Sequence, residues 1–242
     1  MRTWAGVWLI VTVVALVVAE VTLRLVGLGH PVLYELSPEY GYRPRPDQHV
    51  ERLHGAGVRI NNLGLRAVRD WDTTTSNKVL FLGNSVTYGG SYVSDSSLFS
   101  ERAVAAASGW VSGNGGVNGW GVDNIRGLIV TRGFLPARTY VSVLLEVDFY
   151  RGLAQRPPYF STASPRFALT EALVHLRYQL PELLWPGPAL ESAPGARQKA
   201  EVAVRHLKEI DAFLRAKGRQ HLIYISPYEA QLSGGQPRDF FS

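Results

Sequence analysis

The segment Lys78–Gly90, with the sequence KVLFLGNSVTYGG, constrains the fold of this chain more than any other segment. Its apolar half predicts a buried strand, and the asparagine, serine and glycines that follow predict a sharp turn. Ligands of open α/β sheets bind outside the carboxyl ends of the strands. The segment therefore either displays Ser85 as a nucleophile at a sheet edge or uses it as an ordinary turn residue.

Strand and helix patterns alternate along the rest of the chain. Further strands are expected at 110–112, 139–147 and 221–225, and helices at about 95–108, 123–132 and 197–217. This order predicts a three-layer α/β/α parallel sheet with helices on both faces. A stretch rich in proline and aromatic residues at about 151–196 breaks the alternation. We interpret it as an insertion or lid, with a helix near 170–180.

The first 28 residues differ in kind from the remainder. Trp4–Ala19 is uncharged, with Arg2 before it and Glu20 and Arg24 after it. A bilayer span needs about 20 mainly apolar residues, and this run is longer than the apolar region of a usual signal peptide. We therefore expect residues 1–28 to form a single transmembrane anchor, with the globular domain outside the cytoplasm. A cleaved signal peptide is the alternative.

Residues 29–77 are expected to form an extended juxtamembrane arm, and residues 78–242 the α/β domain. Prolines exclude regular helix from the arm at four positions: Pro31, Pro38, Pro44 and Pro46. A polar loop over 73–77 leads into the first strand of the domain.

Composition excludes several functional classes. The net charge is +5, but the basic residues are dispersed, so we expect no nucleic-acid partner and attribute the charge to solubility and membrane proximity. The chain has no cysteine, which excludes disulfides and thiolate metal sites. It also lacks clustered histidines and carboxylates and the Gly-Lys-Ser/Thr of a phosphate-binding loop. We expect no metal and no cofactor.

Three predicted strands end in residues that can carry chemistry. Ser85 follows the first, a glycine-rich segment from Asn114 to Gly121 follows the second, and Asp148 follows the third. In a parallel sheet these ends share one edge, so the three are expected to face one cleft. A serine nucleophile needs donors for the developing oxyanion, and the backbone amides of Ser85 and Gly119 are the expected donors. Asn84, Asn114, Asn118 and Asp148 are expected to line the site.

The chain resembles the SGNH (GDSL-type) hydrolases and acyltransferases, in their membrane-anchored bacterial form. Gly83–Gly89 matches the first block of that family, a Gly-Asp-Ser followed by Thr and Gly, although Asn84 replaces the aspartate. Asn114–Gly119 matches the second block, Asn-x-x-x-x-Gly. Asn61–Arg66 matches an Asn-x-x-Gly-x-Arg element of anchored relatives. The resemblance implies that Ser85 is the nucleophile and that the amides of Ser85 and Gly119 form the oxyanion hole.

Two departures from that family bear on activity. In the third block, Gly-x-Asn-Asp, Val147 stands where an asparagine donates to the oxyanion, and loss of such a donor costs about 10²–10³ in kcat. The final Asp-x-x-His block has no counterpart, because Asp239 is followed by Ser242 where the histidine belongs. We expect the domain to be incomplete at its carboxyl end.

No histidine is expected to act as the base for Ser85. His175 and His206 lie in helical patterns, and His221 begins a strand away from the cleft. The expected function is that of a membrane-anchored serine esterase or O-acyltransferase acting on an acylated cell-surface glycan or another ester. If the base is missing, the chain is expected to be inactive. The alternatives are a non-catalytic, membrane-tethered binding module on the same fold and a fragment of an active enzyme.

Overall fold

Four parallel strands form the centre of the protein in a computed structural model that describes residues 2–72, 77–185 and 190–227. The strands are β5 (Lys78–Gly83), β6 (Val111–Gly116), β7 (Thr139–Leu144) and β8 (Gln220–Ile225), and their order in the sheet is β6-β5-β7-β8. All six residues of β5 are buried, as expected for a central strand covered on both faces. The predicted parallel α/β sheet is confirmed.

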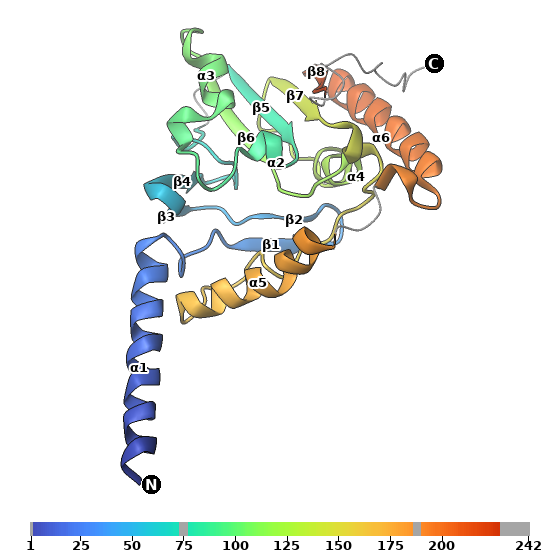
Figure 1. Cartoon of the computed structure of the whole chain (residues 1–242). Helices are drawn as coiled ribbons and strands as arrows, with labels where there is room; N and C mark the ends of the chain where they lie inside the picture. Colours follow the sequence, from blue (N-terminus) through green and yellow to red (C-terminus); the bar gives the residue numbers. More distant parts are fainter. Residues whose placement is uncertain (1, 73–76, 186–189, 228–242) are drawn as a thin grey trace.

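Helices cover both faces of this sheet (Figure 1). On one face, α4 (Val122–Arg126), the π-helical turn η3 (Gly127–Thr131) and α6 (Ala196–Ala216) pack around Leu80 and Leu82. The predicted apolar stripe of α6 is its buried face, consisting of Ala203, Leu207, Ile210 and Leu214. On the other face, α3 (Phe99–Ala105) lies beside β6, and the ring of Phe99 meets that of Phe81 edge-on at 5.5 Å.

Several predicted boundaries are wrong. β6 continues to Gly116, so the first part of the predicted glycine-rich turn is strand, because it pairs with β5 as far as Gly83. Its glycines allow close packing, since a Cβ on Gly113 would lie 2.4 Å from the Trp71 ring. β7 ends at Leu144, and a 3-10 turn, η4 (Glu146–Phe149), follows. The helix predicted from residue 95 is divided into a 3-10 turn, η2 (Asp95–Ser97), and α3, because Leu98 is extended between them.

The arm folds into two hairpins and contributes to the core. β1 (Tyr34–Ser37) pairs with β2 (Gly41–Pro44), and β3 (Gln48–Arg52) pairs through the short turn η1 (Leu53–Gly55) with β4 (Ala56–Ile60). Arg66 forms bridges with Ile60 on one side and with Asn114 of β6 on the other. The arm is therefore joined to the edge of the parallel sheet.

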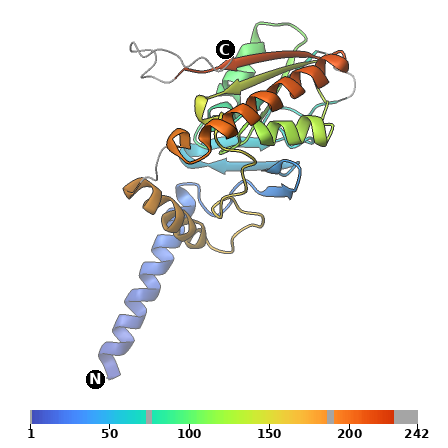
Figure 2. The ribbon, with the colours of Figure 1, turned by 90° about the vertical axis from the view of Figure 1, so that its right-hand side faces the viewer.

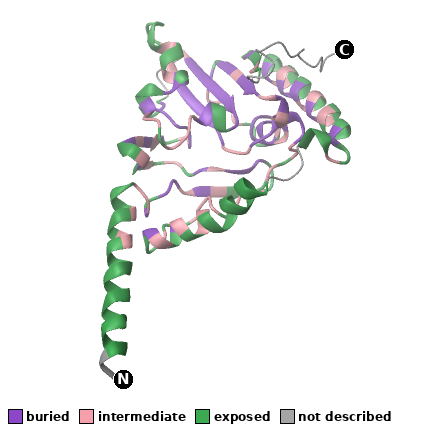
Figure 3. Cartoon of the chain, viewed as in Figure 1, coloured by how far each residue is buried: buried purple, intermediate pink, exposed green. Residues whose placement is uncertain are grey.

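Two further helices lie on the side of the sheet where the chain begins. α1 (Arg2–Leu25) projects away from the globular part, and it is exposed along most of its length (Figure 3). α5 (Ala168–Leu184) is longer than the predicted helix at 170–180 and starts beside the end of α1 (Figures 1 and 2). A short 3-10 turn, η5 (Leu190–Ser192), precedes α6. The predicted loop at 73–77 lies largely outside the described residues, and Asp239 lies wholly outside them.

Candidate active site

Ser85 is the first residue of α2 (Ser85–Tyr88), a single helical turn that directly follows β5. Asn84 caps this turn by accepting a hydrogen bond from the Val86 amide at 2.8 Å. Gly83 is required before it, because a Cβ there would lie 2.2 Å from both the Val143 carbonyl oxygen and Thr87 Oγ1. This packing displays Ser85 at the carboxyl end of a buried strand, and its side chain is exposed.

Ser85 stands at the topological switch point of the sheet. The chain runs from β5 outward to β6, and later enters β7 on the opposite side of β5. In sheets of this order, ligands bind outside the carboxyl ends of the strands where the connection changes direction. The predicted position of the serine is therefore the position at which such a sheet offers a site.

Asn84 and Asp148 join the ends of the two strands at this switch point. The Asn84 amide nitrogen donates to both oxygens of the Asp148 carboxylate, at 2.8 and 2.7 Å. The Leu145 amide and Arg151 also donate to this carboxylate, each at 2.8 Å. Burial raises the pKa of Asp148 above its ordinary value, while the bonds from Leu145, Asn84 and Arg151 act in the opposite direction. Asp148 is thus a buried acceptor that fixes Asn84, the residue that caps the Ser85 turn.

An open pocket of ≈ 680 Å³ lies over Ser85. Its walls come from the segment after α1, the arm, α2 and the loop after it, the loop after β6, the segment before α5, and α5. They consist of Leu28, Arg52, Leu53, Ser85, Val86, Gly89, Gly90, Ser91, Tyr92, Asn118, Phe160, His175 and Gln179. Ser85 and Asn118 of the predicted site thus share one cavity. Asn84, Asn114 and Asp148 are buried and are not among the residues that line it.

His175 is a pocket residue that sequence reasoning did not place near Ser85. Its Nε2 lies 3.9 Å from the Glu171 carboxylate, and its ring lies against Tyr159 at 5.6 Å between centroids. Glu171 is buried and is paired with Arg52 at 2.5 Å. The Glu171–His175 spacing of four residues puts both side chains on one helical face, but only the tertiary fold brings that face to Ser85.

The loop that carries Gly119 is fixed by the arm. Gly119 has φ +83°, a conformation that favours glycine, and a Cβ there would lie 2.9 Å from the Tyr42 hydroxyl. That hydroxyl donates to the Asn118 carbonyl oxygen, and Trp120 Nε1 donates to the Tyr42 carbonyl at 2.8 Å. The role of the Gly119 amide as an oxyanion donor stays a prediction. Val147 lies in η4, one residue before Asp148.

Asn114 has a structural position inside β6. Its side-chain nitrogen donates to the Thr87 carbonyl oxygen in α2, and its side-chain oxygen accepts from the Gly116 amide at 2.9 Å. The Asn114 backbone also exchanges two hydrogen bonds with Arg66, at 2.8 and 3.0 Å. This residue therefore connects the arm, β6 and the turn that bears Ser85.

Arg66 holds the glycine-rich loop after Ser85 in place. The guanidinium is buried; it donates to the carbonyl oxygens of Tyr88 at 2.9 Å and Gly90 at 2.7 Å, and also to that of Val93. It pairs with Asp95 at 2.8 Å. Gly89 and Gly90 belong to the pocket wall. Arg66, the last residue of the Asn-x-x-Gly-x-Arg element, therefore shapes the pocket by holding the backbone of this loop.

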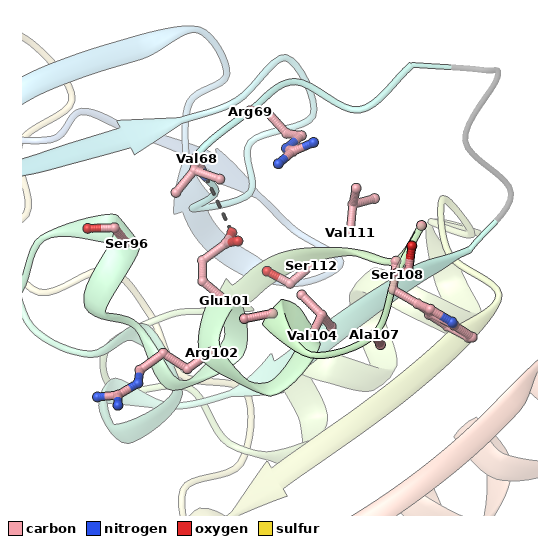
Figure 4. Close-up of a pocket in the computed structure, with 13 residues that line it drawn as sticks. Val68, Arg69, Ser96, Glu101, Arg102, Val104, Ala107, Ser108, Val111 and Ser112 are labelled. Atoms are coloured by element: carbon pink, nitrogen blue, oxygen red, sulfur yellow. Dashed lines mark hydrogen bonds between the residues drawn. The ribbon is translucent and has the colours of Figure 1, made fainter.

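Another pocket, of ≈ 580 Å³, lies between α3, β6 and the arm (Figure 4). Glu101 points toward Val68 there and accepts a hydrogen bond from its amide at 3.4 Å. This pocket includes none of the predicted site residues. Over residues 2–72, 77–185 and 190–227, no group of three or more metal-binding side chains is found.

Two further histidines, in α6 and β8, are engaged away from Ser85. His206 of α6 contacts Asp123 of α4 at 2.7 Å. His221 of β8 is buried, and its Nε2 lies 2.9 Å from Ser142 Oγ. Within the described ranges, Ser85 Oγ itself makes no side-chain hydrogen bond.

No family model and no curated protein matches this chain. The assignment of function therefore depends on the geometry of the site.

Proposed function

We propose that this chain is a membrane-anchored serine esterase or O-acyltransferase of the SGNH type, with Ser85 as the nucleophile. The observation that carries the proposal is the exposed hydroxyl of Ser85 in a pocket at the β5–β7 switch point. A glycine, a capping asparagine and a one-turn helix hold it there.

The chemistry follows from the nucleophile. Ser85 Oγ attacks the carbonyl carbon of an ester while its proton passes to a base, and the alcohol leaves with a proton to give an acyl-enzyme. Water or an acceptor hydroxyl then takes the acyl group and restores the serine. The amides of Ser85, at the start of α2, and of Gly119 are the donors that we propose for the developing oxyanion, since the Val86 amide is taken by Asn84. His175 is the first candidate for the base, because it lines the same pocket.

The substrate we propose is an ester at a membrane surface, such as an acylated glycan. α1 contains a 22-residue stretch, Trp4–Leu25, that is long and apolar enough to cross a membrane. The pocket includes Leu28 and Arg52, which lie just beyond that helix and beside its end. Anchoring by α1 would hold the pocket close to the bilayer, on the side we expect to be extracytoplasmic.

A membrane-tethered binding module is the second candidate function. It is favoured by the lack of a side-chain hydrogen bond to Ser85 Oγ among the residues the structure describes, since an unassisted serine is a weak nucleophile. In that case the pocket would bind an ester or glycan without turning it over.

Covalent labelling separates the two functions. The full chain in detergent is treated with a fluorophosphonate, which reacts with activated serines, and the labelled residue is identified by mass spectrometry. Labelling at Ser85 that disappears in Ser85→Ala and falls in His175→Ala supports the catalytic proposal. An unlabelled chain that hydrolyses aryl esters no faster than Ser85→Ala supports the binding module and contradicts the catalytic proposal. His206→Ala is the matched control, since His206 is bound to Asp123 outside the pocket.

A further inference from the structure

One side of α5 carries a row of five leucines, of which the first is partly buried and the other four are exposed. The row consists of Leu169, Leu173, Leu176, Leu180 and Leu183, with alternating spacings of four and three residues. This spacing keeps the side chains on one side of a helix. Leu173 is 61% exposed and Leu183 is 78% exposed. Phe167 and Trp185, at the two ends of the helix, are exposed as well.

The first turn of α5 is fixed to the rest of the protein on the side opposite the leucine row. Ala168 and Glu171 are buried. Glu171 pairs with Arg52 of β3 at 2.5 Å and accepts a hydrogen bond from the Gly29 amide at 2.6 Å. A charged pair of this kind, removed from water, tolerates little rotation of the helix. The exposed leucines are therefore a fixed surface.

The amino end of α5 is tied to the end of the apolar part of α1. The Glu20 carboxylate accepts hydrogen bonds from the amides of Ala168 at 2.9 Å and Leu169 at 3.0 Å. Arg24 donates to the Arg166 carbonyl at 3.2 Å. Glu20 is the first charged residue after the uncharged run of α1. α5 thus begins at the level where a membrane-spanning α1 would leave the hydrocarbon.

The direction of α5 agrees with this level. In Figures 1 and 2, α5 departs from the end of α1 at a wide angle, beneath the hairpin of β1 and β2, on the side from which α1 projects. An amphipathic helix in a membrane interface lies in the plane of the bilayer, with its apolar side in the boundary between headgroups and acyl chains. Tryptophan, present as Trp185 at the carboxyl end of α5, is enriched at this boundary.

We propose that α5 lies in the bilayer interface with its leucine row in contact with lipid. The proposal rests on the proposed anchoring by α1 and is independent of the chemistry at Ser85. A second copy of the chain is the competing occupant, because the same spacing occurs in coiled coils. The connection of α5 to the emerging end of α1 favours lipid.

This placement has a consequence for the pocket. His175 and Gln179 of α5 line the cavity over Ser85, and they also line a second pocket on α5 together with Leu176, Leu180 and Leu183. With the leucine row in contact with lipid, the cavity over Ser85 would lie beside the membrane surface.

Site-directed fluorescence tests the proposal on the full chain. The protein has no cysteine, so single cysteines at Leu176, Leu180, Tyr178 and Val13 can each carry an environment-sensitive dye. Tyr178 is the matched control, since it is exposed and lies two residues from both leucines, on the other side of the helix. Val13, in the middle of α1, reports the anchor. Each protein is reconstituted in phosphatidylcholine–phosphatidylglycerol vesicles containing lipid spin-labelled near the headgroup or near the chain end.

The expected result is blue-shifted emission and quenching by shallow spin label at positions 176 and 180, with quenching by aqueous iodide at 178 and by deep spin label at 13. Quenching at 13 combined with iodide access at 176 and 180 would overturn the α5 proposal and leave the anchor intact. A position 13 that no lipid label quenches would overturn the anchor and α5 together. Dye self-quenching at 176 and 180 that persists on dilution with lipid would assign the row to a second copy and overturn lipid contact.

Discussion

The side-chain amide of Asn84 donates to both oxygens of the Asp148 carboxylate, at 2.8 and 2.7 Å, and so ties the carboxyl end of β5 to the turn after β7. Both residues are 1% exposed. The aspartate found at the position of Asn84 in the SGNH first block would put a second carboxylate against Asp148. The asparagine of this chain therefore suits its buried partner.

We predict that Asn84→Asp destabilises the protein in a pH-dependent manner. Two buried carboxylates in contact raise the pKa of one of them, so the folded state binds a proton more tightly than the unfolded chain. The contribution of this carboxyl group to stability is then full below about pH 4, near the unfolded carboxyl pKa, and is lost as pH rises through the raised folded value. Thermal unfolding in detergent at several pH values measures this. Asn84→Ala removes the donor without adding charge, and a deficit in Asn84→Asp with the same pH dependence as in Asn84→Ala would contradict the explanation.

We expect Arg66→Met to be severely destabilising. The substitution leaves Asp95 without its guanidinium partner and also frees the carbonyls of Tyr88 and Gly90. Breaking a buried pair from one side costs about 3–5 kcal/mol. The measurement is the free energy of unfolding, with proteolysis between residues 88 and 95 as the local readout.

Two comparisons make the Arg66 prediction specific. Adding Asp95→Asn to Arg66→Met should recover part of the loss, because it removes the unpaired charge. Arg215→Met breaks the pair with Asp211 on the surface of α6, where Arg215 is 68% exposed, and should cost far less, because water screens an exposed ion pair. Equal losses in Arg66→Met and Arg215→Met would show that burial of the pair does not matter.

Gly83→Ala should disrupt the turn that displays Ser85. The added Cβ would lie 2.2 Å from the Val143 carbonyl oxygen, which belongs to the β7 backbone and cannot move freely. Overpacking of this kind costs about 1–3 kcal/mol, and occasionally more. Gly57→Ala in β4 is the control, because nothing lies within 4 Å of its added Cβ. Unfolding temperatures that fall equally in the two variants would rule out the close approach as the cause.

Val13→Arg should reduce membrane retention. The substitution places a charge at the centre of the apolar stretch Trp4–Leu25, where insertion scales assign a cost of about 2.5–3.5 kcal/mol. The fraction of protein remaining in membranes after an alkaline carbonate wash is the measurement, and Val13→Leu is the control. Recovery of the unsubstituted protein without detergent, or a mature amino terminus at Glu20, would contradict an anchor.

Local patterns in the sequence predict the elements whose burial is periodic. The apolar run before Ser85 predicts β5, and the spacing of Ala203, Leu207, Ile210 and Leu214 predicts the inner face of α6. Both predictions succeed because a helix buried on one face has regularly spaced apolar residues, and a strand buried on both faces is a continuous apolar run. Boundaries fail where glycines are involved: glycines favour turns in a local pattern, whereas pairing with β5 extends β6 to Gly116.

The sequence by itself determined a parallel α/β sheet with Ser85 at a strand end and an apolar helix at the amino terminus, because hydrophobic periodicity and turn chemistry are local properties. Only the tertiary structure decided that His175 shares the pocket of Ser85, that Arg66 holds the loop beside it, and that Glu20 joins α1 to α5. These contacts join residues far apart in the chain. Packing, and the need to pair buried charges and backbone groups, select the partners in these contacts. Local sequence patterns do not contain this information.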